Sequence, residues 1–411
     1  MEPMNQDVVI VVVADEILQA RRTEANAAWL SRRLFEAGIP LAEVRIVSDT
    51  PGTLAEALRS LRRRGRTVVS TGGLGPTRDD RTRSESAAAF GRNLVRSAEA
   101  LAQVEARYRM LGRPMDEAAH LQADIPEGSR VVRNPQGTAP SFSVEEDGFR
   151  HVALPGVPRE VRAIWEDSLG AMLSEAADRP GIRRLFTHGL GESEQETRMA
   201  DLALSDIEFC SLPGFFGVEI QCLARGEGDR DARAARALEE VARRLGSAVV
   251  RPLGCTLVQS LQANLRRRGW KMFFAESCTA GLAAAEVAAL PGISDVLAGG
   301  VVAYANEVKR ELLGVSEKTL ATHGAVSRET ALEMARGASR LCGGGLGLAV
   351  TGVAGPDGGT PEKPVGLVWI AHCSPKGESA VELRLLGERD DIRRRAAWRS
   401  IGLGWSVTRE T

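Results

Sequence analysis

Near the start of the chain, Val8–Val13 is an unbroken run of five valines and one isoleucine. Such β-branched runs are typical of parallel strands that are buried on both faces. Helical periodicity follows over residues 26–34, and a second strand–helix–strand passage ends at Ser70. This alternation predicts an α/β fold in which helices cover an open parallel sheet.

The length of the chain, 411 residues, is too great for one ordinary core and suits two or three domains. Residues 1–176 carry the α/β alternation, with one helix expected over Arg83–Leu111. Residues 177–252 have the pattern of a small α+β unit, which we expect to act as a linker or to shape a dimer. Residues 253–411 return to the α/β pattern, so we expect three domains.

The charge balance argues against a nucleic-acid-binding protein, because 53 basic and 54 acidic residues leave a formal charge of −1. No apolar run approaches the ~18 residues of a membrane span, and the first residues lack the basic segment of a signal peptide. Six cysteines without a CxxC pair and five histidines without HxxxH indicate neither a disulfide framework nor a zinc site. We expect a reduced, cytoplasmic protein that binds neither nucleic acid nor membrane.

Lysine is scarce in this sequence, since only five of the 53 basic residues are lysines and all five lie beyond residue 270. Tyrosine is scarcer still, with only Tyr108 and Tyr304. In a chain biased towards arginine, a surface lysine could have become arginine. A functional role for a remaining lysine therefore gains weight.

A glycine-rich loop, Ser70–Asp80, follows a strand and precedes a helix. Glycines in this position let the backbone approach a ligand and present N–H groups to a phosphate. Asp79 and Asp80, with Glu16 after the first strand, offer the oxygen ligands that a divalent cation prefers, and a cation there suits hydrolysis of a pyrophosphate bond. The alternative is that both aspartates only place charge at the start of a helix.

A second loop, Glu276–Gly281, lies where a strand turns into a helix and contains Ser277 and Cys278. From the residues alone either side chain could be the nucleophile, because a helix N-terminus lowers the pKa of a thiol and a base can activate a serine. No histidine has a suitable sequence context, so Lys309 is the candidate base, with Tyr304 relaying a proton or orienting the group. The alternative makes Lys309 a solvated helix residue.

A third loop, residues 351–366, combines repeated glycines with Pro356, Pro361 and Pro364, which stiffen it. A strand that runs into such a loop favours close approach of the backbone to a ligand phosphate or ribose.

Three motifs of the N-terminal region, TGGLGPTRDDRT, NPQGTAP and LPGVPRE, resemble the N-terminal domain of the CinA family (competence/damage-inducible protein A). The resemblance implies a three-layer, molybdopterin-binding-like domain that cleaves ADP-ribose to AMP and ribose 5-phosphate. A divalent metal (Mg, Mn or Co) would be held by Glu16, Asp79 and Asp80. The implied substrate-binding residues are Asn26, Gly72, Gly73, Gly75, Thr77, Gly137 and Thr138.

The N-terminal region departs from the family pattern at three places. Ala14 stands where the family usually has glycine before Asp15 and Glu16. Asn26 is what remains of an Asp-Thr-Asn motif, and Ser141 replaces the glycine that usually follows NPxGTAP.

In the C-terminal region, AESCTAGL, GGVVAYANEVKRELLGV, TGVAGPDGGTPEKPVG and DDIRRRAAW resemble the CinA C-terminal domain, which also exists alone as a nicotinamide mononucleotide (NMN) amidohydrolase. The resemblance implies an α/β domain that hydrolyses NMN to nicotinate mononucleotide and ammonia without a cofactor. Ser277 would be the nucleophile, with Tyr304 and Lys309 as activating partners and Thr351 in the catalytic site. The implied substrate-binding residues are Glu276, Cys278, Thr279, Gly281, Gly352, Gly355, Gly358, Gly359 and Arg393, with Arg389 as an alternative to Arg393 for the phosphate. Ala280 stands where glycine is frequent.

Between these regions, Gly189–Glu194 (GLGESE) matches the KH-like module of the family. The whole pattern predicts a homodimeric enzyme of pyridine-nucleotide recycling with two sites, whose partners are the small nucleotides NMN and ADP-ribose. The alternative is that the N-terminal domain binds a nucleotide or pterin as a non-catalytic regulatory module and that only the C-terminal amidohydrolase is active.

Overall fold

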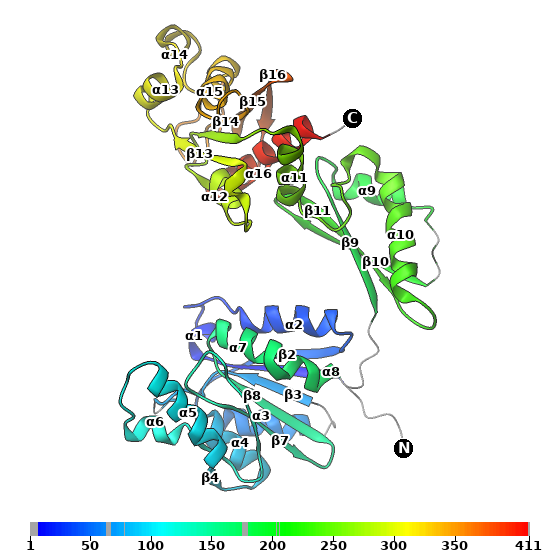
Figure 1. Ribbon diagram of the computed structural model, residues 1–411, viewed down its shortest axis with the longest axis vertical. Coiled ribbons are helices and arrows are strands. Elements are labelled where there is room, and N and C mark those ends of the chain that lie inside the picture. The colour runs from blue at the N-terminus through cyan, green and yellow to red at the C-terminus, as the bar shows by residue number, and fades with distance from the viewer. Residues whose placement is uncertain are drawn as a thin grey trace. The chain divides into compact units, whose positions relative to one another are not determined.

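The computed structural model describes residues 7–62, 67–77, 79–174, 180–202, 204 and 206–409. The protein is a mixed α/β structure, as predicted, and divides into two compact units, residues 1–180 and 181–411 (Figure 1). The expected domain boundary between residues 176 and 177 lies outside the described residues. The second unit contains both the expected middle domain and the expected C-terminal domain.

The first unit is built around a six-stranded sheet with the strand order β2-β1-β3-β8-β7-β6. Its strands are β1 (Val8–Val13), β2 (Leu41–Val47), β3 (Thr67–Thr71), β6 (Arg130–Val132), β7 (Ser141–Glu146) and β8 (Phe149–Leu154). β1, β2, β3 and β8 are parallel, whereas β7 pairs antiparallel with β8 and β6. The carboxyl ends of the parallel strands meet at one edge, where the loop after β3 leaves the sheet.

The helices of the first unit connect and cover these strands (Figure 1). They are α1 (Asp15–Leu18), α2 (Asn26–Glu36), α3 (Thr53–Arg62), α4 (Thr82–Phe90), α5 (Ala98–Met110), α6 (Glu117–Leu121), α7 (Pro158–Ile164), the π-helical turn η1 (Trp165–Leu169) and α8 (Gly170–Ser174). A separate two-stranded sheet consists of β4 (Leu94–Arg96) and β5 (Asp124–Pro126).

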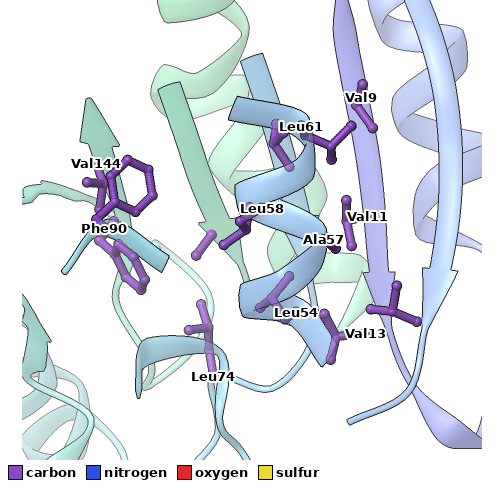
Figure 2. Close-up of a cluster of buried hydrophobic side chains, with 14 of the residues drawn as sticks. Val9, Val11, Val13, Leu54, Ala57, Leu58, Leu61, Leu74, Phe90 and Val144 are labelled. Carbon is purple, nitrogen blue, oxygen red and sulfur yellow. The ribbon is translucent and has the colours of Figure 1, made fainter. Parts of the chain in front are cut away.

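Alternate residues of β1 point to opposite faces of the sheet, and each face has its own apolar core. The odd-numbered valines pack with Leu54, Leu58 and Leu61 of α3 (Figure 2). The even-numbered residues pack with Leu30 and Leu34 of α2 and with buried side chains of α7. The unit therefore has the three layers expected of a molybdopterin-binding-like domain.

The single helix expected over Arg83–Leu111 is wrong. α4 ends at Phe90 because Gly91 adopts a left-handed conformation (φ +63°), which glycine takes without steric cost. β4 follows, and Ser97 then starts α5 by accepting a hydrogen bond from the N–H of Ala100. The helical periodicity of the flanking residues had hidden this break.

Residues 181–250 of the second unit contain an antiparallel sheet in the order β10-β11-β9, covered by two helices. The elements are β9 (Gly181–Thr187), α9 (Glu192–Met199), β10 (Ile207–Gly214), β11 (Gly217–Ala224), α10 (Arg230–Leu245) and the 3-10 turn η2 (Gly246–Ala248). Leu238, Val241 and Leu245 of α10 pack on Leu185 and Ile220 of the sheet. This part has the small α+β pattern expected from the sequence.

The rest of the second unit surrounds a five-stranded sheet in the order β13-β12-β14-β15-β16. The strands are β12 (Met272–Glu276), β13 (Leu297–Val302), β14 (Leu346–Gly352), β15 (Leu367–Ser374) and β16 (Gly377–Arg384). The helices are α11 (Leu257–Arg268), α12 (Leu282–Ala288), the 3-10 turn η3 (Ile293–Asp295), α13 (Asn306–Leu313), α14 (Glu317–His323), α15 (Arg328–Leu341) and α16 (Arg389–Thr408). β12 is parallel to both neighbours, and the last two strands are antiparallel.

Helices cover both faces of this sheet. Phe274 of β12 packs with α11, α12 and α16, whereas the next residue, Ala275, packs with α13 and α15 on the opposite face. Phe186 and Val250 from the preceding α+β part belong to the same apolar core as Phe274. No helix among the described residues is long and apolar enough to cross a membrane.

Candidate functional site

The first candidate site lies in the second unit, where β12 ends and the turn Ser277–Gly281 leads into α12. Ser277 is only 9% exposed, and its N–H donates a 2.9 Å hydrogen bond to the carbonyl of Val350 on the neighbouring strand. The N–H groups of Cys278 and Thr279 have no hydrogen-bond partner among the described residues. The turn therefore combines a fixed serine with two buried backbone N–H groups that no other described residue uses.

Glu276 holds this turn from the side of the helix. Its buried carboxylate accepts hydrogen bonds from the N–H groups of Gly281, Ala283 and Ala284 at 3.0, 3.1 and 2.9 Å. These bonds use the free donors at the start of α12, which would otherwise attract an anion. Glu276, predicted to bind substrate, is placed to position the turn.

Lys309, on α13, is 1% exposed and faces Ser277, so the alternative of a solvated lysine is wrong. Its Nζ lies 3.3 Å from Ser277 Oγ, 2.7 Å from the carbonyl oxygen of Ala303 and 3.0 Å from that of Tyr304. Burial lowers the pKa of Lys309 below its ordinary value. When Lys309 is neutral, the two carbonyls take its two N–H groups and its lone pair can accept the proton of Ser277.

The Tyr304 hydroxyl contacts Arg389 and not Lys309. The side chain is 57% exposed, and its Oη accepts a 3.1 Å hydrogen bond from Arg389. Arg389 also donates to the carbonyl of Gly355 and so joins the tyrosine to the third glycine-rich loop. It is the main-chain carbonyl of Tyr304, not its hydroxyl, that contacts Lys309. The sequence could not distinguish these two groups of one residue.

Cys278, the alternative nucleophile, packs in an apolar cluster with Val350, Val368 and Ile392. Burial raises the pKa of its thiol to about 12. The thiol is therefore protonated at neutral pH and lacks the thiolate character that a cysteine nucleophile needs. The geometry favours Ser277 over Cys278.

Three other predicted residues make contacts of different kinds. Arg393 donates to the carbonyls of Cys278 and Thr279 at 3.2 and 3.1 Å and so holds the middle of the turn. Thr351 is fully buried, and its hydroxyl donates to the carbonyl of Ala325 at 2.7 Å. Thr279 is also fully buried, and its hydroxyl has no hydrogen-bond partner among the described residues.

The glycines of the third loop serve different purposes. A side chain at Gly352 would meet Val368 and the carbonyl of Leu367, and one at Gly355 would meet Val365, so packing requires both glycines. Gly359 lies close to the backbone of Val365. Gly358 has a left-handed conformation and faces open space, which leaves its backbone open to a ligand.

Ala280, where the family often has glycine, has the left-handed conformation (φ +52°) that L-residues avoid. We expect Ala280→Gly to raise the free energy of unfolding by about 0.5–1 kcal/mol. The left-handed conformation costs an alanine ~1–2 kcal/mol, and the greater freedom of glycine in the unfolded chain offsets part of that gain. Urea unfolding measures the change.

Ala285→Gly, at an exposed position inside α12, is the matched control and should lower stability by about 1 kcal/mol. If both variants lose stability alike, the strain at Ala280 is contradicted.

The second candidate site is a cavity of about 630 Å³ in the first unit, at the carboxyl ends of β1 and β3. It brings together many of the predicted residues. Those lining it are Glu16, Asn26, Gly72, Gly73, Gly75, Asp79, Asp80 and Thr138. Thr77 and Gly137 lie beside it, because Thr77 hydrogen-bonds Asp80 and a side chain at Gly137 would overlap Glu160, which lines the cavity.

The glycines after β3 are required by close contacts. A Cβ on Gly72 would lie 2.3 Å from the carbonyl oxygen of Val13, and one on Gly75 would lie 2.4 Å from Asp80 Oδ2. Asn26 is buried and donates to the Thr71 hydroxyl and the carbonyl of Gly156, both at 2.9 Å. Its own Oδ1 has no partner among the described residues, so it is free to accept a bond from a ligand in the cavity.

The carboxylates around this cavity influence one another. Burial, and then the neighbouring Asp15, raise the pKa of Asp49, and the charges of Asp79 and Glu16 act in the same direction. The sequence reasoning missed Asp49, although it follows the parallel strand β2 by two residues and so lies at the expected edge of the sheet.

A divalent metal fits the chemistry of these groups only in part. Among the described residues, no three carboxylate, imidazole or thiol side chains form a group that could hold an ion. Mg²⁺ often uses one or two carboxylates together with waters and substrate phosphates. Asp79 with Glu16 or Asp49 offers such a partial ligand set, whereas Asp80 Oδ2 already accepts from the N–H and hydroxyl of Thr77.

Comparison with known proteins gives matches in both units. A family model described as "CinA C-terminal domain" matches residues 255–403, and one described as "Probable molybdopterin binding domain" matches residues 9–175. A CinA-like protein of Gemmatimonas aurantiaca is 37% identical over 401 residues, which cover 95% of this chain and 94% of that protein. A putative competence-damage inducible protein of Acetivibrio thermocellus is 37% identical over 389 residues, covering 93% and 94% of the two chains.

Among solved structures, a competence/damage inducible protein from Agrobacterium tumefaciens is 40% identical, covers 36% of this chain and 90% of its own, and has a TM-score of 0.35. With relatives that match over nearly its whole length, the chain belongs to the CinA family and carries a molybdopterin-binding-type domain before its CinA C-terminal domain.

Proposed function

We propose that the second unit hydrolyses the carboxamide of NMN to nicotinate mononucleotide and ammonia. The observation that carries this proposal is the contact between Lys309 Nζ and Ser277 Oγ inside a buried site. A desolvated lysine beside a serine is a known way to activate a nucleophile without histidine or metal. The test is release of ammonia from NMN by the purified protein.

The first half of the reaction forms an acyl-enzyme. Neutral Lys309 accepts the proton of Ser277, and Oγ attacks the carboxamide carbon, whose oxygen becomes negative. The free N–H groups of Cys278 and Thr279 stabilise that oxygen. The protonated lysine then passes its proton to the amide nitrogen, the C–N bond breaks, and ammonia leaves.

In the second half of the reaction, water gives up a proton to Lys309 and attacks the ester carbon of the acyl-enzyme. The acid is released and Ser277 regains its proton.

Arg389 and Arg393 have different roles in this proposal. Arg393 holds the carbonyls of Cys278 and Thr279 and thereby aims their N–H groups. Arg389 is exposed and touches both Tyr304 and Gly355, so it is the better placed of the two to meet the phosphate of NMN. Tyr304 would then bind substrate rather than relay a proton.

For the first unit we propose metal-dependent cleavage of ADP-ribose to AMP and ribose 5-phosphate. The glycine-rich loop, the free Oδ1 of Asn26 and the carboxylates around the 630 Å³ cavity support it. A bound divalent metal would neutralise the diphosphate and lower the pKa of an attacking water. Asp79, with Glu16 or Asp49, would hold it, and Asp80 would keep the loop in place.

Replacing Asp80 tests this second site. We expect Asp80→Ala to reduce AMP formation from ADP-ribose and Mg²⁺ about 100-fold, because a loop displaced by about 1 Å misplaces the groups that it carries, and we expect Asp80→Asn to reduce it much less. Asp80→Asn keeps an acceptor for the Thr77 N–H and so separates loss of charge from loss of loop structure. Chromatographic assay of AMP gives the rate.

The alternative, a nucleotide- or pterin-binding regulatory module, predicts a different result. Calorimetry would then detect ADP-ribose or pterin binding to the parent protein while no AMP forms with any divalent metal. That outcome would contradict catalysis in the first unit and leave the amidohydrolase proposal untouched.

A further inference from the structure

A third cavity, of about 500 Å³, lies within the second unit between the α+β part and α16. Its lining includes the loop His188–Glu192, which contains most of the GLGESE motif, and Arg395 and Arg399 of α16. Neither proposed reaction uses these residues. The motif is therefore left without a function by everything described so far.

Arg395 and Arg399 are one helical turn apart and face the same cavity. Both side chains are exposed, and neither has a hydrogen bond or ion pair among the described residues, whereas Arg389, Arg393, Arg394 and Arg409 of the same helix region all do. Like charges at this spacing destabilise a helix slightly. Burial, and also the charge of Arg399, lower the pKa of His188, which lines the same cavity. An anion between the two arginines would relieve this repulsion.

Gly191 is not explained by the fold. Its backbone conformation (φ −76°, ψ 157°) suits any residue, and a Cβ there would meet nothing within 4 Å. It is the N-cap of α9 but supplies no capping side chain, so the first N–H groups of the helix, those of residues 192–194, have no partner among the described residues. A glycine at this position leaves those donors open to the cavity.

The cavity is also partly apolar. Leu190, Phe215 and Leu385 line it together with the arginines, and Phe215 is 40% exposed. Glu192 also lines the cavity, and no ion pair joins it to Arg395 or Arg399. Two cationic forks beside an exposed aromatic ring suit a ligand with a doubly charged phosphate at one end and an apolar ring at the other.

We propose that this cavity, between the GLGESE loop and α16, is a binding site for a phosphomonoester that carries an apolar ring. Arg395 and Arg399 bind the phosphate from one side, and the N–H groups at the start of α9 bind it from the other. Phe215 and the neighbouring aliphatic side chains contact the ring. The site is separate from Ser277 and from the cavity of the first unit.

Phenyl phosphate is the simplest probe of this chemistry, and inorganic phosphate is the control ligand that lacks the ring. Isothermal titration of the full-length protein should show that phenyl phosphate binds more tightly than inorganic phosphate. Arg395→Gln and Arg399→Gln should each weaken the binding of phenyl phosphate about tenfold. Arg243→Gln, an exposed arginine of α10 paired with Glu240, is the matched control and should change nothing.

The Gly191→Asp variant distinguishes a role of Gly191 in phosphate binding from a role in the stability of α9. An aspartate at an N-cap stabilises its helix, so the unfolding midpoint should hold or rise, while its carboxylate should repel the phosphate and weaken phenyl phosphate binding at least tenfold. The proposal is overturned if the parent protein does not bind phenyl phosphate, if ring-free phosphate binds as tightly, or if the arginine and Gly191→Asp variants bind it as the parent does.

Discussion

Ser277→Ala is expected to reduce ammonia release from NMN by at least about 10⁴-fold, because Ser277 is the one hydroxyl among the described residues that is hydrogen-bonded to Lys309. The hydroxyl is 3.3 Å from the lysine nitrogen, and hydrogen bonds that join the turn to Glu276 and Arg393 hold it in place. Removing Oγ should leave this framework intact. The variant should therefore fold normally and still bind NMN.

Cys278→Ala is the matched control for Ser277→Ala. The thiol is buried among apolar side chains and stays protonated, so its loss should lower stability slightly and leave kcat nearly unchanged. Full activity in Ser277→Ala together with loss of activity in Cys278→Ala would reverse the assignment of the nucleophile.

Lys309→Met is expected to lower kcat about 10³-fold, within the range that general-base catalysis supplies. Methionine keeps much of the apolar volume of the lysine stem and removes the base. Lys309→Arg should be equally inactive, because a guanidinium stays protonated and cannot accept the serine proton. An active Lys309→Arg enzyme would show that charge, not proton transfer, is what Lys309 contributes.

The pH dependence follows from the lowered pKa of Lys309. The parent rate should rise with pH as the lysine loses its proton, with a midpoint below the ordinary value of 10.5. Between that midpoint and 10.5 the unfolded chain binds more protons at this residue than the folded one, so the free energy of unfolding should also rise with pH. Lys309→Met should lose both effects, and a parent profile that stays flat up to pH 10.5 would contradict the assignment.

The sequence predicted which residues meet in the second unit better than what each one does. The scarcity of lysine gave weight to Lys309, and the strand–turn–helix pattern indicated Ser277 and Cys278 as alternatives, between which only the family resemblance chose. The pattern could not show that Glu276 turns its carboxylate onto three N–H groups of α12, or that the Tyr304 hydroxyl points to Arg389. Side-chain direction depends on packing between elements far apart in the chain.

In the fold, too, local features were predicted and features that depend on distant contacts were missed. The valine run of β1 was correctly predicted to be a buried strand, because its composition leaves little choice. The break at Gly91 was missed, since one glycine in an otherwise helical pattern is decided by the contacts of the following strand and helix. Asp49 was missed for a related reason, because its role depends on the order in which strands lie side by side.

Ammonia release from NMN, measured with the parent protein and Ser277→Ala side by side in the presence of a chelator, is the most direct test of the amidohydrolase proposal. The parent should release one ammonia for each nicotinate mononucleotide formed, without any added metal, and Ser277→Ala should release none above background. An inactive parent protein, or a Ser277→Ala variant as active as the parent, would contradict the proposed function of the second unit.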